Sequence, residues 1–264
     1  IQTRLGWGAF GERTVSLTSA TRSDEVAAVG ALRYRHRDGD FPYRNQSLVP
    51  PRTVRRGNAD RTEIQGFVRL HGPDGPGPWA GGLWIADGER GAPGPATGSP
   101  RPARQRDGLY RAWGHLRVRP VNRPVILRSA LQHQVLTYRD SSTGLDATGR
   151  TWTARTSAEQ RWSPAGEHQI STGLSAAFDR AEHPSLADAA RRGELGIHAS
   201  GRLDWDRLIL YPSVRLDGYL PSGTDPQISA PLSPQIGLNY RLTPSAPLRW
   251  KARIGRAYRV PTLN

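Results

Sequence analysis

The sequence contains no cysteine and no methionine, and Lys251 is its only lysine. Without cysteine, disulfide bonds and thiolate chemistry are excluded. Methionine is missing at position 1 as well, so we expect a processed form or a fragment of a longer product. No apolar run approaches the roughly 18 residues that a membrane-spanning helix needs. No secretory leader pattern begins the chain.

Motifs of catalysis and of metal binding are also missing. The histidines never reach a ligand spacing such as HxH or HExxH, and no GxSxG, P-loop or GxGxxG stands in the right context. We therefore expect neither an enzyme nor a metal site nor a resident cofactor. Asp38 and Asp40, in the sequence DGD, could still help to hold Ca²⁺ in a loop, because Ca²⁺ takes oxygen ligands.

The chain is strongly basic, with a net charge of +14 over 264 residues, and nearly all of its cations are arginine. Such a balance can indicate nucleic acid binding. The arginines are spread along the chain, however, and no zinc-finger, RNA-binding or helix-turn-helix pattern accompanies them. We expect no nucleic acid partner.

The strongest positive signal is alternation near the end of the chain. The runs Leu232–Thr243 and Leu248–Tyr258 both place apolar residues at even positions and mostly polar residues at odd positions. A period of two puts the two sets on opposite faces of a strand. Two successive runs of about eleven residues, with aromatics near their ends, are typical of strands that cross an outer membrane. The polar face of the second run is expected to line a lumen with Arg249, Lys251 and Arg253.

The same period recurs along the chain and predicts about 12 or 13 strands. Trp152 and Trp162 share one face of a predicted strand, and their separation of about 25 Å matches the apolar band between two aromatic girdles. Two segments interrupt the pattern. Ser141–Gly149 is predicted to be a loop of turn-forming residues, and Arg180–Arg192 a short helix-like piece within a loop.

Short and long connections alternate between the predicted strands. The short ones fall near residues 21, 74, 121, 165, 206 and 245, and the long ones near 48, 97, 145, 186 and 226. Tight periplasmic turns and long extracellular loops have this asymmetry in outer-membrane barrels. The predicted fold class is therefore all-β, an antiparallel transmembrane β-barrel.

The first long loop holds the candidate ligand contacts. Arginine clusters suit anionic, carboxylate-bearing chelates, and a ligand arriving from outside would meet this loop. The alternative is that its arginines are solvated or contact anionic lipopolysaccharide at the surface of the outer-membrane lipid. The candidates are Phe41, Tyr43, Arg44, Arg52, Arg55 and Arg56.

The last ten residues, 255–264, read GRAYRVPTLN. They resemble the barrel signature of TonB-dependent outer-membrane receptors, and weaker similarities include LGWGAFGERTVSL near the start and RGAPGP in a long loop. The nearest group is that of cobalamin and siderophore receptors. The resemblance implies a bacterial outer-membrane receptor for energy-coupled uptake of a siderophore- or cobalamin-like ligand. Its signature positions are Arg256, Tyr258, Arg259, Pro261, Thr262, Leu263 and Asn264.

The chain departs from this family in extent. Such barrels have about 22 strands around a plugged lumen, and the resemblance implies a plug and a TonB-binding segment before the barrel. We expect residues 1–264 to be the N-terminal half of the barrel, without the plug, because neither feature is recognisable. Half a barrel leaves two open edges, which a bilayer does not tolerate. A complete, passive porin-type barrel of about 12 to 14 strands and a soluble basic β-protein remain as alternatives.

Overall fold

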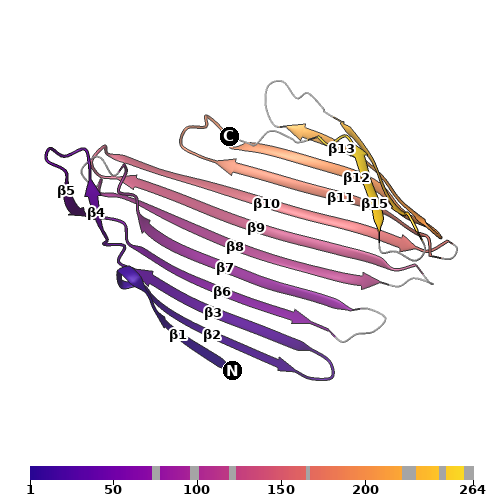
Figure 1. Ribbon diagram of the computed structural model, residues 1–264, viewed down its shortest axis with the longest axis horizontal. Coiled ribbons are helices and arrows are strands. Elements are labelled where there is room, and N and C mark those ends of the chain that lie inside the picture. Colours follow the sequence, from indigo (N-terminus) through magenta and orange to yellow (C-terminus); the bar gives the residue numbers. More distant parts are fainter. Residues whose placement is uncertain are drawn as a thin grey trace.

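A computed structural model describes residues 1–72, 78–95, 101–118, 123–164, 167–221, 230–243 and 248–258. Thirteen strands form one antiparallel sheet in the order β1-β2-β3-β6-β7-β8-β9-β10-β11-β12-β13-β14-β15, and β4 and β5 form a separate hairpin (Figure 1). This confirms the predicted all-β class and strand number. The strands are β1 Gln2–Trp7, β2 Arg13–Arg22, β3 Ala27–Arg37, β4 Pro42–Asn45, β5 Arg52–Arg55, β6 Arg61–His71, β7 Trp79–Gly91, β8 Ala103–Val118, β9 Val125–Asp140, β10 Leu145–Trp162, β11 Gln169–Glu182, β12 Ala190–Trp205, β13 Leu208–Pro221, β14 Leu232–Arg241 and β15 Arg249–Gly255.

The two faces of the sheet carry different side chains. Consecutive strands pair without interruption of register, so residues directly opposite each other share a face. On β10, Trp152 and Ala154 lie on one face and Glu159 and Arg161 on the other, as the alternation predicts. A concavity of about 1020 Å³ touches residues from the end of β8 to β15, with Glu159, Arg161, Lys251 and Arg253 in its lining. Only the inner side of a curved sheet can be shared by strands so far apart in the strand order.

The convex face is apolar and exposed. Large hydrophobic side chains with more than a third of their surface accessible include Leu83, Leu131, Leu174, Leu195 and Ile197. Among the described residues, the buried hydrophobic side chains are only Ala80, Ala103 and Tyr219. A water-soluble protein does not leave its apolar surface uncovered on this scale. The face instead fits a hydrocarbon environment, where alternate residues of each strand meet lipid.

The two ends of the sheet also differ. One end, called here the loop end, holds the 3-10 turn Ala9–Gly11 and the β4–β5 hairpin; the other, the turn end, holds connections such as the one between β12 and β13. In the described residues no helix has the length and apolar character of a membrane span. β1 and β15 stand at the two edges of the sheet.

Two predicted interruptions are wrong. The residues expected to form a loop up to Gly149 turn only at 141–144, because Leu145 already begins β10 and pairs with Asp140. The expected helix-like piece from Arg180 to Arg192 contains no described helix; β11 continues to Glu182 and β12 resumes at Ala190. In both segments, pairing with a neighbouring strand outweighs the local propensity for turn or helix.

Candidate ligand site

The first long loop is built around an aromatic cluster at the loop end. The ring centroids of Phe10 and Phe41 lie 5.5 Å apart, and those of Phe41 and Tyr43 lie 6.4 Å apart. The guanidinium of Arg56 lies 6.0 Å from the centre of the Tyr43 ring and also donates a hydrogen bond to the carbonyl oxygen of Gly94. Phe41, Tyr43 and Arg56 are half-buried. These three predicted contacts therefore hold the loop together.

The other three predicted contacts are exposed. Arg44 and Arg52 belong to the β4–β5 hairpin, where Arg44 faces Thr53 and Arg52 faces Asn45 across the strands. Arg55 is exposed as well, but its Nη1 lies 2.7 Å from a carboxylate oxygen of Asp40. The structure thus divides the six residues into a packed set and an exposed set, and their contact with a ligand stays a prediction.

The two carboxylates considered for Ca²⁺ have basic neighbours. Asp40 pairs with Arg55, and Asp38 lies 3.0 Å from Nε2 of His36. Within the described parts of the chain, no three His, Asp or Glu side chains are grouped so that they could hold a metal ion. The Ca²⁺ hypothesis stays a prediction.

A second basic feature lies on the concave wall beneath this loop. Arg37 on β3 is directly opposite Arg61 on β6, which is directly opposite Arg90 on β7. Like charges directly opposite each other are unfavourable. Two carboxylates relieve part of the repulsion, Glu63 at 2.9 Å from Arg61 and Asp107 at 4.0 Å from Arg90. We call Arg37, Arg61 and Arg90 the inner arginine row.

Sequence reasoning missed the inner arginine row. Each of its members stands at a polar position of an alternating run, so the sequence indicates the concave face for each one separately. What brings them side by side is the register across β3, β6 and β7, and two of these strands are separated by the whole first loop. Nε of Arg37 is buried and makes no hydrogen bond to any residue that the structure describes, so the polar groups of this wall are not all hydrogen-bonded within the described part of the chain.

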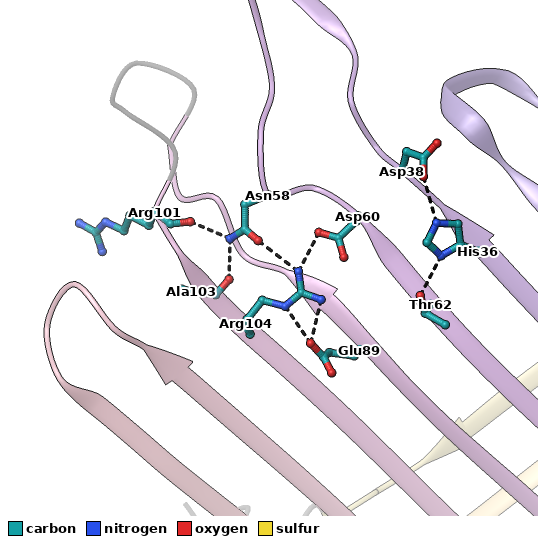
Figure 2. A network of polar contacts seen from close by, with 9 residues as sticks. All are labelled: His36, Asp38, Asn58, Asp60, Thr62, Glu89, Arg101, Ala103 and Arg104. Carbon is teal, nitrogen blue, oxygen red and sulfur yellow. Dashed lines mark hydrogen bonds and ion pairs between the residues drawn. The ribbon is translucent and has the colours of Figure 1, made fainter.

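On the convex face, a network of polar contacts ties the loop to the strand ends (Figure 2). Arg104, the second residue of β8, contacts Asp60 at 2.7 Å and Glu89 at 2.7 Å. The side-chain amide of Asn58 donates to the carbonyl oxygens of Arg101 at 2.6 Å and of Ala103 at 2.7 Å. The residues that close the first loop are thereby fixed to the start of β8.

A further ion pair fixes the turn between β1 and β2. Nη2 of Arg35 donates to a carboxylate oxygen of Glu12 at 2.9 Å. This hydrogen bond, supported by the charges of Arg35, Arg37 and Arg33, lowers the pKa of Glu12 below its ordinary value.

The predicted basic residues of the last strand lie on the concave side. Lys251 and Arg253 line the large concavity, and Arg249 lines a smaller one at the turn end. The smaller cavity is lined by acids as well as bases, Asp204 and Asp206 among them.

Of the signature residues, Arg256 and Tyr258 belong to the described part of the chain, and the ring of Tyr258 lies 5.9 Å from that of Tyr219. The remaining signature residues lie outside the described residues: Arg259, Pro261, Thr262, Leu263 and Asn264.

A curved antiparallel sheet with a lipid-facing apolar surface and a basic inner wall defines an outer-membrane β-barrel protein. The chain belongs to the β-barrel family of TonB-dependent receptors: the family model described as TonB dependent receptor-like, beta-barrel, matches residues 3–264. Members of this family are outer-membrane transporters and not enzymes. This agrees with the predicted location in the outer membrane and with the expectation that the chain is not an enzyme. The match favours a receptor barrel over a self-contained porin or a soluble protein.

Solved structures share the fold at low sequence identity. The FrpB iron transporter from Neisseria meningitidis superposes with a TM-score of 0.74 and 8% identity, over 91% of this chain and 43% of that one. The ferripyoverdine receptor of Pseudomonas aeruginosa superposes with a TM-score of 0.69 and 13% identity, over 91% of this chain and 40% of that one. The copper transporter OprC superposes with a TM-score of 0.72 and 14% identity, over 99% of this chain and 46% of that one. The chain thus spans less than half the length of each of these proteins. No curated protein sequence matches it.

Proposed function

We propose that residues 1–264 are the N-terminal half of the barrel of a TonB-dependent receptor that imports an anionic metal chelate of the siderophore type, or a cobalamin-like ligand. The inner arginine row is the observation that carries this proposal. Three guanidinium groups side by side on the inner wall favour a carboxylate-rich ligand, since arginine binds carboxylates with a planar, two-pronged donor set. The exposed Arg44 and Arg52 would meet the ligand first.

The proposal includes the rest of the barrel. β1 and β15 are open edges of the sheet, and unpaired strand edges do not occur within a bilayer. We propose that further strands close the barrel and that a plug preceding residue 1 fills the lumen and binds the TonB complex. The coverage of less than half of the solved relatives supports this division. The cargo differs among those relatives, so their names leave the ligand of this chain open.

Uptake by cells that express the full receptor tests the proposal. We expect radiolabelled ferric chelates with free carboxylates to enter, and dissipation of the proton gradient to stop their entry. The variant R61Q/R90Q should weaken chelate binding by about tenfold, because it removes two of three charges from the wall. R139Q is the matched control, since Arg139 pairs with Asp146 on the convex face. Entry that continues without the proton gradient would contradict energy coupling, and undiminished binding by R61Q/R90Q would contradict the site.

A further inference from the structure

The concavity of about 1020 Å³ lies at the turn end of the inner wall, far from the inner arginine row. Its lining includes Arg202 and Tyr211, on either side of the connection between β12 and β13. Successive cross-strand partners lead from Arg90 on β7 to Ala147 on β10, and β10 runs on from there to Arg161 in the concavity. That stretch of β10 is about 46 Å long at the usual rise of a strand. A small chelate does not span it, so the concavity is a separate place on the wall.

Three serines line this concavity side by side. Ser171 on β11 is directly opposite Ser200 on β12, which is directly opposite Ser213 on β13. The hydroxyl oxygens of Ser171 and Ser200 lie 2.8 Å apart, so one of the two hydroxyls donates to the other. Each hydroxyl has one hydrogen to donate, and the hydrogen of the accepting serine is left over for an anion. We call Ser171, Ser200 and Ser213 the serine row.

The charges around the serine row are mainly positive. Glu159 is the one acid among the described residues that line the concavity, and its carboxylate oxygens already lie 2.8 Å from Arg128 and 2.6 Å from Arg161. Three further cations of the lining form no ion pair within the described part of the chain: Arg117, Lys251 and Arg253. Nε of Arg117 is also buried and makes no hydrogen bond to any residue that the structure describes. The concavity therefore has a surplus of positive charge next to hydroxyl donors.

Nearer the loop end, the same strands balance their inward charges. Arg215 on β13 contacts Glu194 at 3.2 Å and Asp217 at 2.7 Å. The surplus is thus confined to the turn end of these strands. A cleft lined by charges of one sign raises the local concentration of ions of the opposite sign. The concavity is therefore suited to an anion that reaches the turn end of the lumen.

We propose that the serine row, with Arg117, Lys251 and Arg253, forms an exit site, a second binding site for the carboxylate-bearing chelate on its way from the inner arginine row to the periplasm. Guanidinium and ammonium groups neutralise carboxylates, and hydroxyl groups donate hydrogen bonds to them. Passage through a pore is fastest when several sites each bind the ligand weakly enough to release it. The inference rests on the proposed function, which sets the class of ligand and the direction of transport.

The test compares import with surface binding in cells that express the full receptor. The probes are radiolabelled ferric citrate and ferric rhizoferrin, two anionic carboxylate chelates. The variant K251Q/R253Q should lower the import rate by about tenfold, because it removes two of the charges that concentrate the chelate at the turn end. Binding to energy-depleted cells should stay unchanged, because the contacts at the loop end are intact. K251Q alone should lower import by about threefold, which keeps the test valid if the double variant does not fold.

R249Q is the matched control, because Arg249 lies on the same strand and face but lines the smaller cavity, together with Asp204 and Asp206. It should import both chelates as the unmodified receptor does. Unchanged import by K251Q/R253Q, or an equal loss of surface binding and import, would overturn the exit site alone. Faster entry of a large antibiotic into K251Q/R253Q cells would also overturn it, by showing that these cations retain the plug. If the unmodified receptor imports neither chelate, the proposed ligand class fails and the exit site fails with it.

Discussion

A guanidinium nitrogen of Arg104 on β8 lies 2.7 Å from a carboxylate oxygen of Asp60, although Asp60 stands before β6, two strands away. Gly91 on β7 separates them, and its N–H donates to the Asp60 carbonyl oxygen at 2.9 Å. A Cβ at Gly91 would lie 2.1 Å from the carbonyl oxygen of Asn58. Only glycine therefore lets the end of the first loop lie across β7 and reach Arg104.

This relationship predicts that Arg104 controls the order of the first loop. The free energy of unfolding of the variant R104Q should be lower by about 1 kcal/mol, as expected for a partly exposed ion pair. Added protease should cleave residues 46–52 faster in the folded variant than in the unmodified receptor. R104K keeps the charge but loses the two-pronged geometry, so its cleavage rate should lie between that of the unmodified receptor and that of R104Q. Equal cleavage rates in R104Q and in the unmodified receptor would show that the network does not restrain the loop.

The aromatic cluster predicts that the order of the first loop and the binding of the ligand depend on different residues. F41A removes both ring contacts of Phe41, each worth about 0.5–1.5 kcal/mol, and should speed protease cleavage of the loop by about tenfold. R44A should leave cleavage unchanged, because Arg44 is exposed, yet should weaken binding of the chelate. A similar effect of the two variants on both measurements would refute the division of the predicted contacts into packed and exposed sets.

Gly82 on β7 is expected to be intolerant of a side chain. Trp113 is directly opposite, with the guanidinium of Arg69 5.9 Å from its ring centre. A Cβ at Gly82 would lie 2.9 Å from the Trp113 ring and 2.7 Å from the carbonyl oxygen of Val68. G82A should therefore destabilise the barrel by about 1–3 kcal/mol, measured by urea unfolding in micelles. The control is G114A, whose Cβ would meet its nearest atom at 3.7 Å. Equal stability of the two variants would contradict the close packing of Trp113 and the Val68 carbonyl oxygen against Gly82.

The ion pair between Glu12 and Arg35 predicts a pH dependence of known sign. The hydrogen bond from Arg35 lowers the pKa of Glu12 from its ordinary 4.5. The contribution of the pair to stability is therefore present above pH 4.5 and is lost as the pH falls through the lower, folded-state pKa. Carbon-13 NMR of the Glu12 carboxyl should show a midpoint below 4.5, and R35Q should move that midpoint upward. An identical midpoint in both proteins would exclude the pair as the cause.

The alternation of apolar and polar residues predicted the strands and their faces, because a period of two is a property of each strand by itself. Trp152, Lys251 and Arg253 lie on the faces that their positions indicate. The sequence also predicted the family, through the RVPTLN stretch and the alternating connections. Its two errors, at residues 145–149 and 180–192, fall where strands extend beyond the expected apolar band and local composition favours turns or a helix.

The amino-acid sequence by itself determined that this protein is a lipid-facing antiparallel sheet with a basic inner side. Only the tertiary structure decided which charges meet. Alternation assigns a residue to a face but does not say which residue of the next strand lies opposite, and that register depends on how loops of very different length close. The pairing of Arg37 with Arg61 is therefore a property of the folded sheet, and the proposed ligand site depends on it.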